Sequence, residues 1–424
     1  KVFGDDFKTH HYDKKCFSGI YDIEDTEIWR TRNKLRKKLI NAVKDIMSDT
    51  SVTAHYSPRQ IVTIKKTLRD DVLTIGFARR FATYKRATLV FRNLERLNEI
   101  VNNPERPVQF LFAGKAHPAD KAGQDFIKYI ISKMPQFIGK IVFIPNYDIT
   151  LAKLLVQGVD VWMNNPTRPL EASGTSGEKA VMNGVMHFSV LDGWWVEGYK
   201  QGAGWALQME RTYDNQDFQN ELDAATIYNI FENEISRIFY TKNNDGISPE
   251  WISHIKNTVA QVACDFTTNR MMSDYLDKYY KPLSERNTML VADDFLVARK
   301  IAFWKKFMYR EWPKIEILSY EKTNNNQYEL FLGQEHISEI DVFLGEADPE
   351  DIGFEILVAE QDKKGEHHIK EVVEYKMVSF EKGVAKYRLS MTPDVSGAYQ
   401  IAGRVYAKNA LLPHRQDFDL VKWL

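Results

Sequence analysis

Residues 159–193 read VDVWMNNPTRPLEASGTSGEKAVMNGVMHFSVLDG, and this stretch decides the fold class. Short apolar runs at 159–165 and 186–193 flank a cluster of small residues and a helix predicted over 177–184. Runs of this length without polar alternation are typical of strands in a parallel sheet that helices cover on both faces. The stretch therefore predicts a strand–helix–strand unit of the α/β class.

The same alternation continues on the N-terminal side of this stretch. The remaining predicted elements are strands at 72–78, 108–114 and 141–146, and helices at 86–102, 119–133 and 149–157. Polar residues follow each predicted strand, and ligands of parallel sheets bind at the carboxyl ends of strands. The sequence therefore predicts one convergent site at that edge of the sheet.

An amphipathic helix is predicted over 25–47, ahead of the first strand. Its basic run consists of Arg30, Arg32, Lys34, Arg36, Lys37 and Lys38. Such a run could bind phosphate, but charge runs on helices usually face solvent, so we expect a solvated face here.

The sequence changes in character after residue 313. Before this point, helices are predicted at 217–240, 249–269, 271–282 and 291–311. Alternating apolar and polar residues then predict about seven strands, including 328–333 and a single run at 371–383. The aromatic side chains expected in the core of these strands are Tyr328, Phe331, Phe343 and Phe354. We therefore expect an α/β domain at 1–290, a linking helix at 291–312 and an all-β sandwich at 313–424.

Composition limits the classes of partner. The 57 Lys and Arg residues nearly balance 58 Asp and Glu residues, which gives no indication of nucleic acid or an anionic membrane as partner. No apolar run reaches the roughly 18 residues that a membrane span needs. Two cysteines, Cys16 and Cys264, cannot form a disulfide framework, and we expect a cytoplasmic protein.

Two stretches after predicted strands carry the chemistry. GFARRFATYKR (76–86) places several cations before a helix, which suits a dianion or, alternatively, salt bridges at a domain edge. Gly174–Gly177 precede Lys179 at a helix start, without a Walker or dinucleotide-binding glycine pattern. Two interpretations remain open: a flexible loop with a surface lysine, or a phosphate cradle beside a lysine that bonds an aldehyde cofactor. His117 is more simply explained as a structural residue.

Four motifs together resemble the α-glucan (glycogen-type) phosphorylases of the shorter bacterial and archaeal branch. They are EASGTSGEKAVMNG (171–184), RRFATYKR (79–86), GKAHPAD (114–120) and LDGWWVEGY (191–199). The resemblance extends over about 15–283. It implies a GT-B glycosyltransferase architecture, of which this chain corresponds to the Rossmann-like C-terminal domain.

The resemblance also implies pyridoxal 5'-phosphate as cofactor. Lys179 matches the lysine that binds this cofactor as a Schiff base. Thr175 and Ser176 match positions whose backbone groups hold the cofactor phosphate, together with Arg79, where a lysine is commoner. Tyr147 matches a tyrosine near the cofactor ring. The resemblance implies no metal site.

The substrate side of the site follows from the same resemblance. Arg80 and Lys85 match the pair that binds inorganic phosphate. Glu178 and Ala82–Thr83 depart from the commoner residues, but neither change removes a charge that the chemistry needs. The positions that match groups around the glucosyl unit are Tyr84, Glu171, Ala172, Ser173 and Gly174.

The implied activity is phosphorolysis of α-1,4-glucan, with inorganic phosphate as co-substrate and glucose 1-phosphate as product. Only about 70 residues precede the first predicted strand, and the chain begins without methionine. We therefore expect an N-terminal GT-B domain to be missing and the chain to be inactive alone. Alternatives are a nucleotide-sugar glycosyltransferase resembling glycogen synthase, or a non-catalytic glucan-binding or regulatory module. Association into a homo-oligomer is left open.

Overall fold

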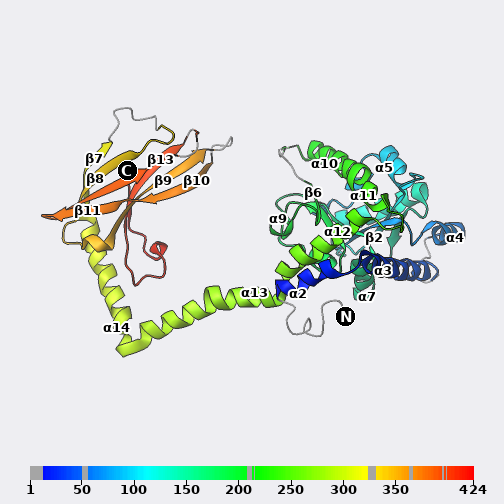
Figure 1. Ribbon diagram of the computed structural model, residues 1–424, viewed down its shortest axis with the longest axis horizontal. Helices are drawn as coiled ribbons and strands as arrows, with labels where there is room; N and C mark the ends of the chain where they lie inside the picture. Colours follow the sequence, from blue (N-terminus) through cyan, green and yellow to red (C-terminus); the bar gives the residue numbers. More distant parts are fainter. Residues whose placement is uncertain are drawn as a thin grey trace. The chain divides into compact units, whose positions relative to one another are not determined.

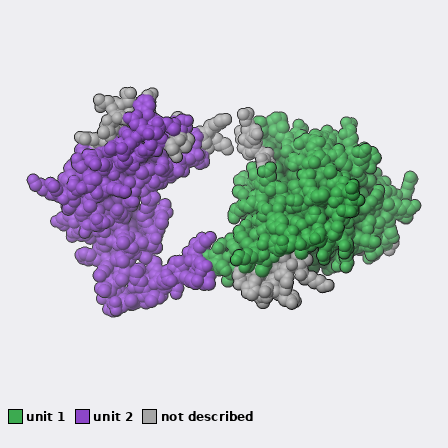
Figure 2. Space-filling view, viewed as in Figure 1, with its two compact units in different colours: residues 1–275 green, residues 276–424 purple. Residues whose placement is uncertain are grey.

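The computed structural model describes residues 13–49, 56–207, 213, 215–322, 331–361, 366–393, 396–397 and 399–424. The chain divides into two compact units, Lys1–Tyr275 and Leu276–Leu424 (Figure 2). The first unit contains a parallel sheet with helices, and the second contains two antiparallel sheets (Figure 1). No helix among the described residues is long and apolar enough to cross a membrane.

The first unit is built on a six-stranded parallel sheet in the order β3-β2-β1-β4-β5-β6. Its strands are β1 (Leu73–Ala78), β2 (Val108–Ala113), β3 (Ile141–Ile144), β4 (Val161–Asn164), β5 (Met186–Val190) and β6 (Gly204–Leu207). The five predicted strands are confirmed. The sixth was missed because β6 lies in the stretch QGAGWAL (201–207), whose glycines Gly202 and Gly204 have positive φ and are typical of a turn instead of a strand.

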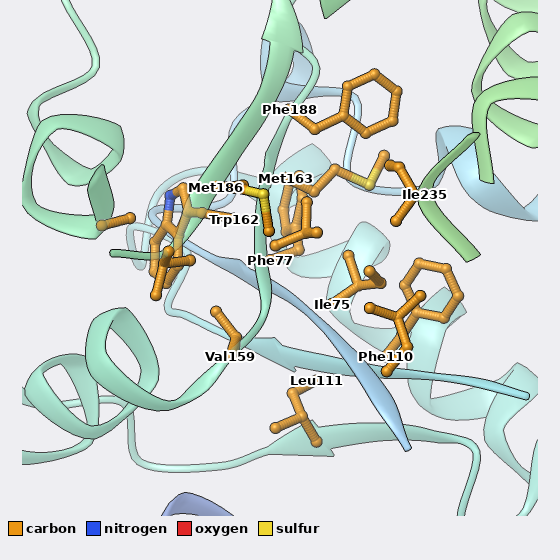
Figure 3. Packing of buried hydrophobic residues seen from close by; sticks show 14 of the residues in the cluster. Ile75, Phe77, Phe110, Leu111, Val159, Trp162, Met163, Met186, Phe188 and Ile235 are labelled. Carbon is orange, nitrogen blue, oxygen red and sulfur yellow. The ribbon is translucent and has the colours of Figure 1, made fainter. Parts of the chain in front are cut away.

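Every residue of these strands is buried, which explains their continuous apolar sequences. Figure 3 shows side chains of this core packing from neighbouring strands, among them Phe77, Phe110, Trp162 and Phe188. Each of these four is at most 2% exposed. Burial of one such side chain stabilises the fold by about 1.5–3 kcal/mol, so the sheet is a rigid base for the loops at its edge.

Helices follow the strands, as predicted, with one exception. They are α5 (Leu94–Val101), α6 (Lys121–Lys133), α7 (Ile149–Gly158) and α8 (Thr175–Val181). The helix predicted over 86–102 was wrong in its first half, where the chain forms a short 3-10 turn at Leu89–Phe91. Another 3-10 turn, at Thr83–Lys85, precedes the predicted helix. Between them Arg86 takes a left-handed backbone with φ 49°, which ends the first turn.

The helix α3 (Asp25–Ile46) forms as predicted, and four of the six residues of its basic run are exposed, as expected for a solvated face. The expectation was wrong for the other two, Arg32 and Arg36. Arg32 is 5% exposed and donates to the backbone carbonyls of Gln157 and Val159. Arg36 is 3% exposed and forms an ion pair of 2.6 Å with Asp160. These acceptors lie more than 120 residues away in sequence, so the local pattern could not indicate them.

The other helices of the first unit are α2 (Lys14–Ser18), α4 (Pro58–Thr67), α9 (Trp195–Gly198), α10 (Gln216–Ile230), α11 (Ser236–Tyr240), α12 (Pro249–Asn257) and α13 (Thr268–Tyr275). The second unit begins with a π-helical turn at Leu276–Tyr280, which is followed by α14 (Lys281–Glu311), whose backbone is non-helical at 292–295. Asp293, Asp294 and Phe295 there have φ values of 50–61°, which interrupts the helix near the predicted start at 291.

Eight strands of the second unit are described: β7 (Glu316–Lys322), β8 (His336–Phe343), β9 (Ile352–Gln361), β10 (His367–Glu374), β11 (Lys376–Glu381), β12 (Val384–Met391), β13 (Gln400–Ala407) and β14 (Val421–Trp423). They form the sheets β10-β9-β13-β14 and β11-β12-β8-β7. Val342 and Tyr387 from one sheet share a hydrophobic cluster with Phe354 and Val405 from the other.

Two details of this unit differ from the predictions. The single strand predicted over 371–383 is divided between the two sheets, because the buried Tyr375 interrupts it and its N–H donates to the Phe354 carbonyl. Phe331 is 58% exposed instead of lying in the core. Tyr328 and residues 323–330 lie outside the described residues, so the strand predicted over 328–333 is described only at its end.

Candidate active site

The candidate site lies at the carboxyl ends of the central strands, where ligands of parallel sheets bind. Arg79 follows β1 directly, Glu171 lies in the loop between β4 and α8, and Asp192 lies in the loop after β5. Since β4 lies between β1 and β5, these loops emerge side by side. The topology therefore brings together residues that are up to 113 positions apart.

A buried cluster of three charges forms the centre of the site. The Glu171 carboxylate, 6% exposed, accepts hydrogen bonds of 3.2 Å at both oxygens from Arg79 Nη2. The same carboxylate pairs with Lys85 Nζ. The two cations are only 9% and 8% exposed. One carboxylate thus balances two buried cations, and the cluster retains a positive charge that favours a further anion.

Arg79 has donor capacity left over. Its Nε and Nη1 atoms are buried without a hydrogen-bond partner among the described residues. A buried donor without a partner costs about 1–3 kcal/mol, and more when it is charged. Burial lowers the pKa of Arg79, and the Glu171 carboxylate opposes this shift. A phosphate oxygen would satisfy both donors with charge-assisted hydrogen bonds.

Two tyrosines border this cluster. Lys85 Nζ lies 4.4 Å from the ring centroid of Tyr84, a cation–π contact that helps to hold the ammonium. Tyr147 is half-buried, and burial raises the pKa of its phenol while the nearby Arg79 lowers it. The net upward shift keeps Tyr147 a hydrogen-bond donor at neutral pH.

The glycine loop leads directly into α8. Gly174 has φ 99°, which favours glycine, and the Gly177 N–H donates to its carbonyl at 2.9 Å. A Cβ at Gly177 would lie 2.7 Å from His187 Cε1 and 2.8 Å from Trp194 Nε1. No side chain fits there without displacing buried rings. The loop can therefore lie directly on the sheet and present the first-turn N–H groups of α8, which lack partners within the helix.

Other predicted residues lie on or near α8. Ser176 Oγ accepts a 3.2 Å hydrogen bond from Trp162 Nε1, which ties the first turn to β4. Lys179 is exposed one turn further on, and no described carboxylate pairs with it. Burial raises the pKa of the adjacent Glu178, and Lys179 opposes this shift. Exposed residues of the predicted set are Arg80, Ala172, Thr175 and Lys179, whereas Ser173 and Gly174 are half-buried.

The structure adds Asp192, to which sequence reasoning assigned no role although it lies in the LDGWW motif. Asp192 is 9% exposed and its two oxygens accept the N–H groups of Glu171 and Gly193, both at 2.9 Å. The Trp194 N–H donates to the Ser173 carbonyl at 2.9 Å. These bonds fix the backbone of the loop that carries Glu171. The sequence signal that could have indicated this role was the Asp192–Gly193 pair just beyond the end of β5.

His187 on β5 was also missed. Its ring is fully buried, stacks on Trp194 at 5.2 Å, and its Nδ1 donates to the Trp162 carbonyl at 3.1 Å. Burial lowers the pKa of His187 to about 3, so the ring is neutral at physiological pH. His187 therefore supports the floor of the glycine loop. Among the described residues, no group of three or more His, Cys, Asp or Glu side chains could hold a metal ion.

Comparison with known families identifies the family to which the chain belongs. Residues 57–204 match the carbohydrate phosphorylase family, and residues 312–424 match the glycogen phosphorylase C-terminal domain family. The chain belongs to the carbohydrate phosphorylases. Within them it is an α-glucan phosphorylase sequence of the short bacterial and archaeal type.

Individual relatives support the same assignment. The chain is 37% identical over 411 residues to the maltodextrin phosphorylase of Thermococcus litoralis, covering 96% of this chain and 47% of that protein. It is 44% identical over 285 residues to the glycogen phosphorylase of Aquifex aeolicus, covering 67% of this chain and 41% of that protein. The chain thus spans less than half the length of these curated relatives.

Proposed function

We propose that the candidate site takes part in phosphorolysis of α-1,4-glucan to glucose 1-phosphate. The observation that carries the proposal is the buried cluster of Arg79, Lys85 and Glu171, in which two buried donors of Arg79 find no partner in the part of the chain that the structure describes. Such donors suit a phosphate oxygen, and the reaction brings two phosphate groups together. Their mutual repulsion requires concentrated positive charge in a site of low dielectric.

The residues present fit pyridoxal 5'-phosphate. The exposed amine of Lys179 would attach the cofactor covalently. The backbone N–H groups of Thr175 and Ser176 and the free donors of Arg79 would hold its phosphate, with Tyr147 beside the ring. When bound, the cofactor supplies a second phosphate group that exchanges a proton with the substrate phosphate.

The chain's own residues would orient the reacting groups. Arg80 and Lys85 would hold inorganic phosphate below the anomeric carbon, and Glu171 would accept a hydrogen bond from a sugar hydroxyl beside Tyr84. The substrate phosphate gives its proton to the glycosidic oxygen as the bond from C1 to that oxygen breaks. An oxygen of the same phosphate then bonds to C1 on the same face. The products are glucose 1-phosphate and a glucan that is one unit shorter.

The proposed turnover is that of a protein as long as the two relatives above, of which this chain spans less than half. We propose a Rossmann-like domain of GT-B type at 1–290, a linking helix at 291–312 and an accessory β-sandwich at 313–424. A second, N-terminal domain would complete the sugar site, so we expect no turnover from this chain alone. We further propose a cytoplasmic location.

Borohydride reduction tests the cofactor site directly. The full chain is incubated with pyridoxal 5'-phosphate, reduced and digested, and we expect mass spectrometry to place a pyridoxyl group on Lys179. The Lys179→Ala variant should lose this adduct, whereas Lys200→Ala, which removes another lysine of the first unit, should retain it. Absence of the adduct from Lys179, or equal labelling of many lysines, would overturn the cofactor assignment and favour a nucleotide-sugar enzyme or a binding module.

A further inference from the structure

A cavity of about 370 Å³ lies in the first unit, away from the candidate active site. We call it the Trp29 cavity; its principal lining residues are Trp29, Asn33, Lys34, Lys37, Phe239 and Lys242. Cavities of this size are sufficient for small-molecule ligands. None of these residues belongs to the site described above.

The position of the Trp29 cavity separates it from that site. Asp70 and Asp71, which also line it, precede β1, whereas Arg79 follows β1. The strand has six residues, and a strand rises about 3.3 Å per residue. The Trp29 cavity therefore lies at the amino-terminal edge of the sheet, roughly 20 Å from the candidate active site.

The cavity carries a net positive charge, because three lysines face one carboxylate, that of Asp70, for which no ion pair is seen among the described residues. Lys34, Lys37 and Lys242 are exposed, and no acidic side chain among the described residues forms an ion pair with them. The carboxylate of Asp71, by contrast, already pairs with Arg69. The three rim ammonium groups are thus available to an anion.

The floor of the cavity is different, because its polar groups are already satisfied. Arg36 directs Nη1 to Asp160 at 2.6 Å and Nε to the Asp70 carbonyl at 2.7 Å, and its Nη2 donates to Asn33. Arg36 is therefore a structural residue. A ligand anion would therefore meet its cationic partners at the lysine rim and would have to lie away from the Asp70 carboxylate.

An aromatic wall adjoins the rim. The half-buried Trp29 ring packs at 5.8 Å from the buried Phe239 ring. Lys242 Nζ lies 5.6 Å from the Trp29 ring centroid. The ammonium thus covers one face of the ring, and because Lys242 is exposed it can swing aside, so that a heteroaromatic base takes its place on Trp29 and the ammonium meets a phosphate group.

We propose that the Trp29 cavity binds a nucleoside diphosphate, with the base against Trp29 and the phosphates between Lys34, Lys37 and Lys242. The proposal also gives a role to the basic run of α3. Two of its arginines are buried in structural hydrogen bonds, while its exposed Lys34 and Lys37 line the cavity. A purely solvated face would not require lysines grouped around an aromatic wall.

Isothermal titration calorimetry of the full chain tests the proposal with three probes. We expect ADP to bind more tightly than pyrophosphate, which lacks the ring, and than adenosine, which lacks the charges. The Lys37→Ala/Lys242→Ala double variant should weaken ADP binding about tenfold, as expected for loss of charge-assisted hydrogen bonds, and should reduce its dependence on salt. Trp29→Leu should weaken ADP binding but leave pyrophosphate binding unchanged.

Two control variants locate the binding. Lys38→Ala removes an exposed lysine of the same helix that does not line the cavity, and Arg80→Ala removes a cation of the candidate active site; both should retain the wild-type ADP affinity. Circular dichroism checks that each variant is folded. ADP binding that is no tighter than pyrophosphate binding, or that is lost in Arg80→Ala and retained in the double variant, would overturn the proposal.

Discussion

Replacement of Glu171 by glutamine tests the charge balance of the candidate active site. The substitution keeps the side-chain size but leaves Arg79 and Lys85, which are 9% and 8% exposed, without their counter-charge. Removing one partner of a buried ion pair costs about 3–5 kcal/mol. For a unit of this size we expect the melting temperature to fall by roughly 6–20 °C, at about 2–4 °C per kcal/mol.

Inorganic phosphate should restore part of this loss. Phosphate can take the place of the missing carboxylate beside both cations, and a ligand at about 100 times its Kd stabilises the folded state by about 2.7 kcal/mol. Differential scanning calorimetry in phosphate and in chloride of equal ionic strength measures the difference. We expect phosphate to stabilise Glu171→Gln more than it stabilises the wild type.

The matched control is Glu355→Gln in the second unit. Glu355 is 1% exposed and likewise pairs with two arginines, Arg404 and Arg415. Its replacement should destabilise the second unit without rescue by phosphate. The reasoning is refuted if Glu171→Gln melts like the wild type, or if phosphate stabilises both variants equally.

Two further predictions concern the floor of the site. The folded pKa of His187 is about 3, against an ordinary value of 6.5, so the folded state with a neutral ring is fully stable above pH 6.5 and loses stability as the pH falls toward 3. Urea titrations of His187→Asn should show lower stability at pH 7 but a smaller loss between pH 6.5 and 4. An unchanged dependence of stability on pH would contradict this. Gly177→Ala should cost about 1–3 kcal/mol in urea denaturation, since its Cβ would lie 2.7 Å from the His187 ring. Gly19→Ala, with no atom within 4 Å of its Cβ and a helical φ of −57°, should be neutral or slightly stabilising; equal stability of both alanine variants would refute the packing argument.

Much of the first unit could be predicted because its signals are local. β1 to β5 are continuous apolar runs, and their burial on both faces follows from helices that lie next to them in the chain. β6 was not predicted because glycines at 202 and 204 make its sequence resemble a turn. The strand predicted over 371–383 was wrong as one element, because only the packing of Tyr375 between two sheets divides it.

The sequence by itself determined the class of the sheet, the edge at which a ligand site should lie, and the residue types that meet there. Strand burial and turn chemistry depend on neighbours within a few positions, so they can be read from a short window. Only the tertiary structure decided which charges pair. Glu171 meets Arg79 across 92 residues, and Arg36 meets Asp160 across 124. Such partners are chosen by the order of strands in the sheet, which brings distant loops together and, within the described ranges, leaves two donors of Arg79 without a partner.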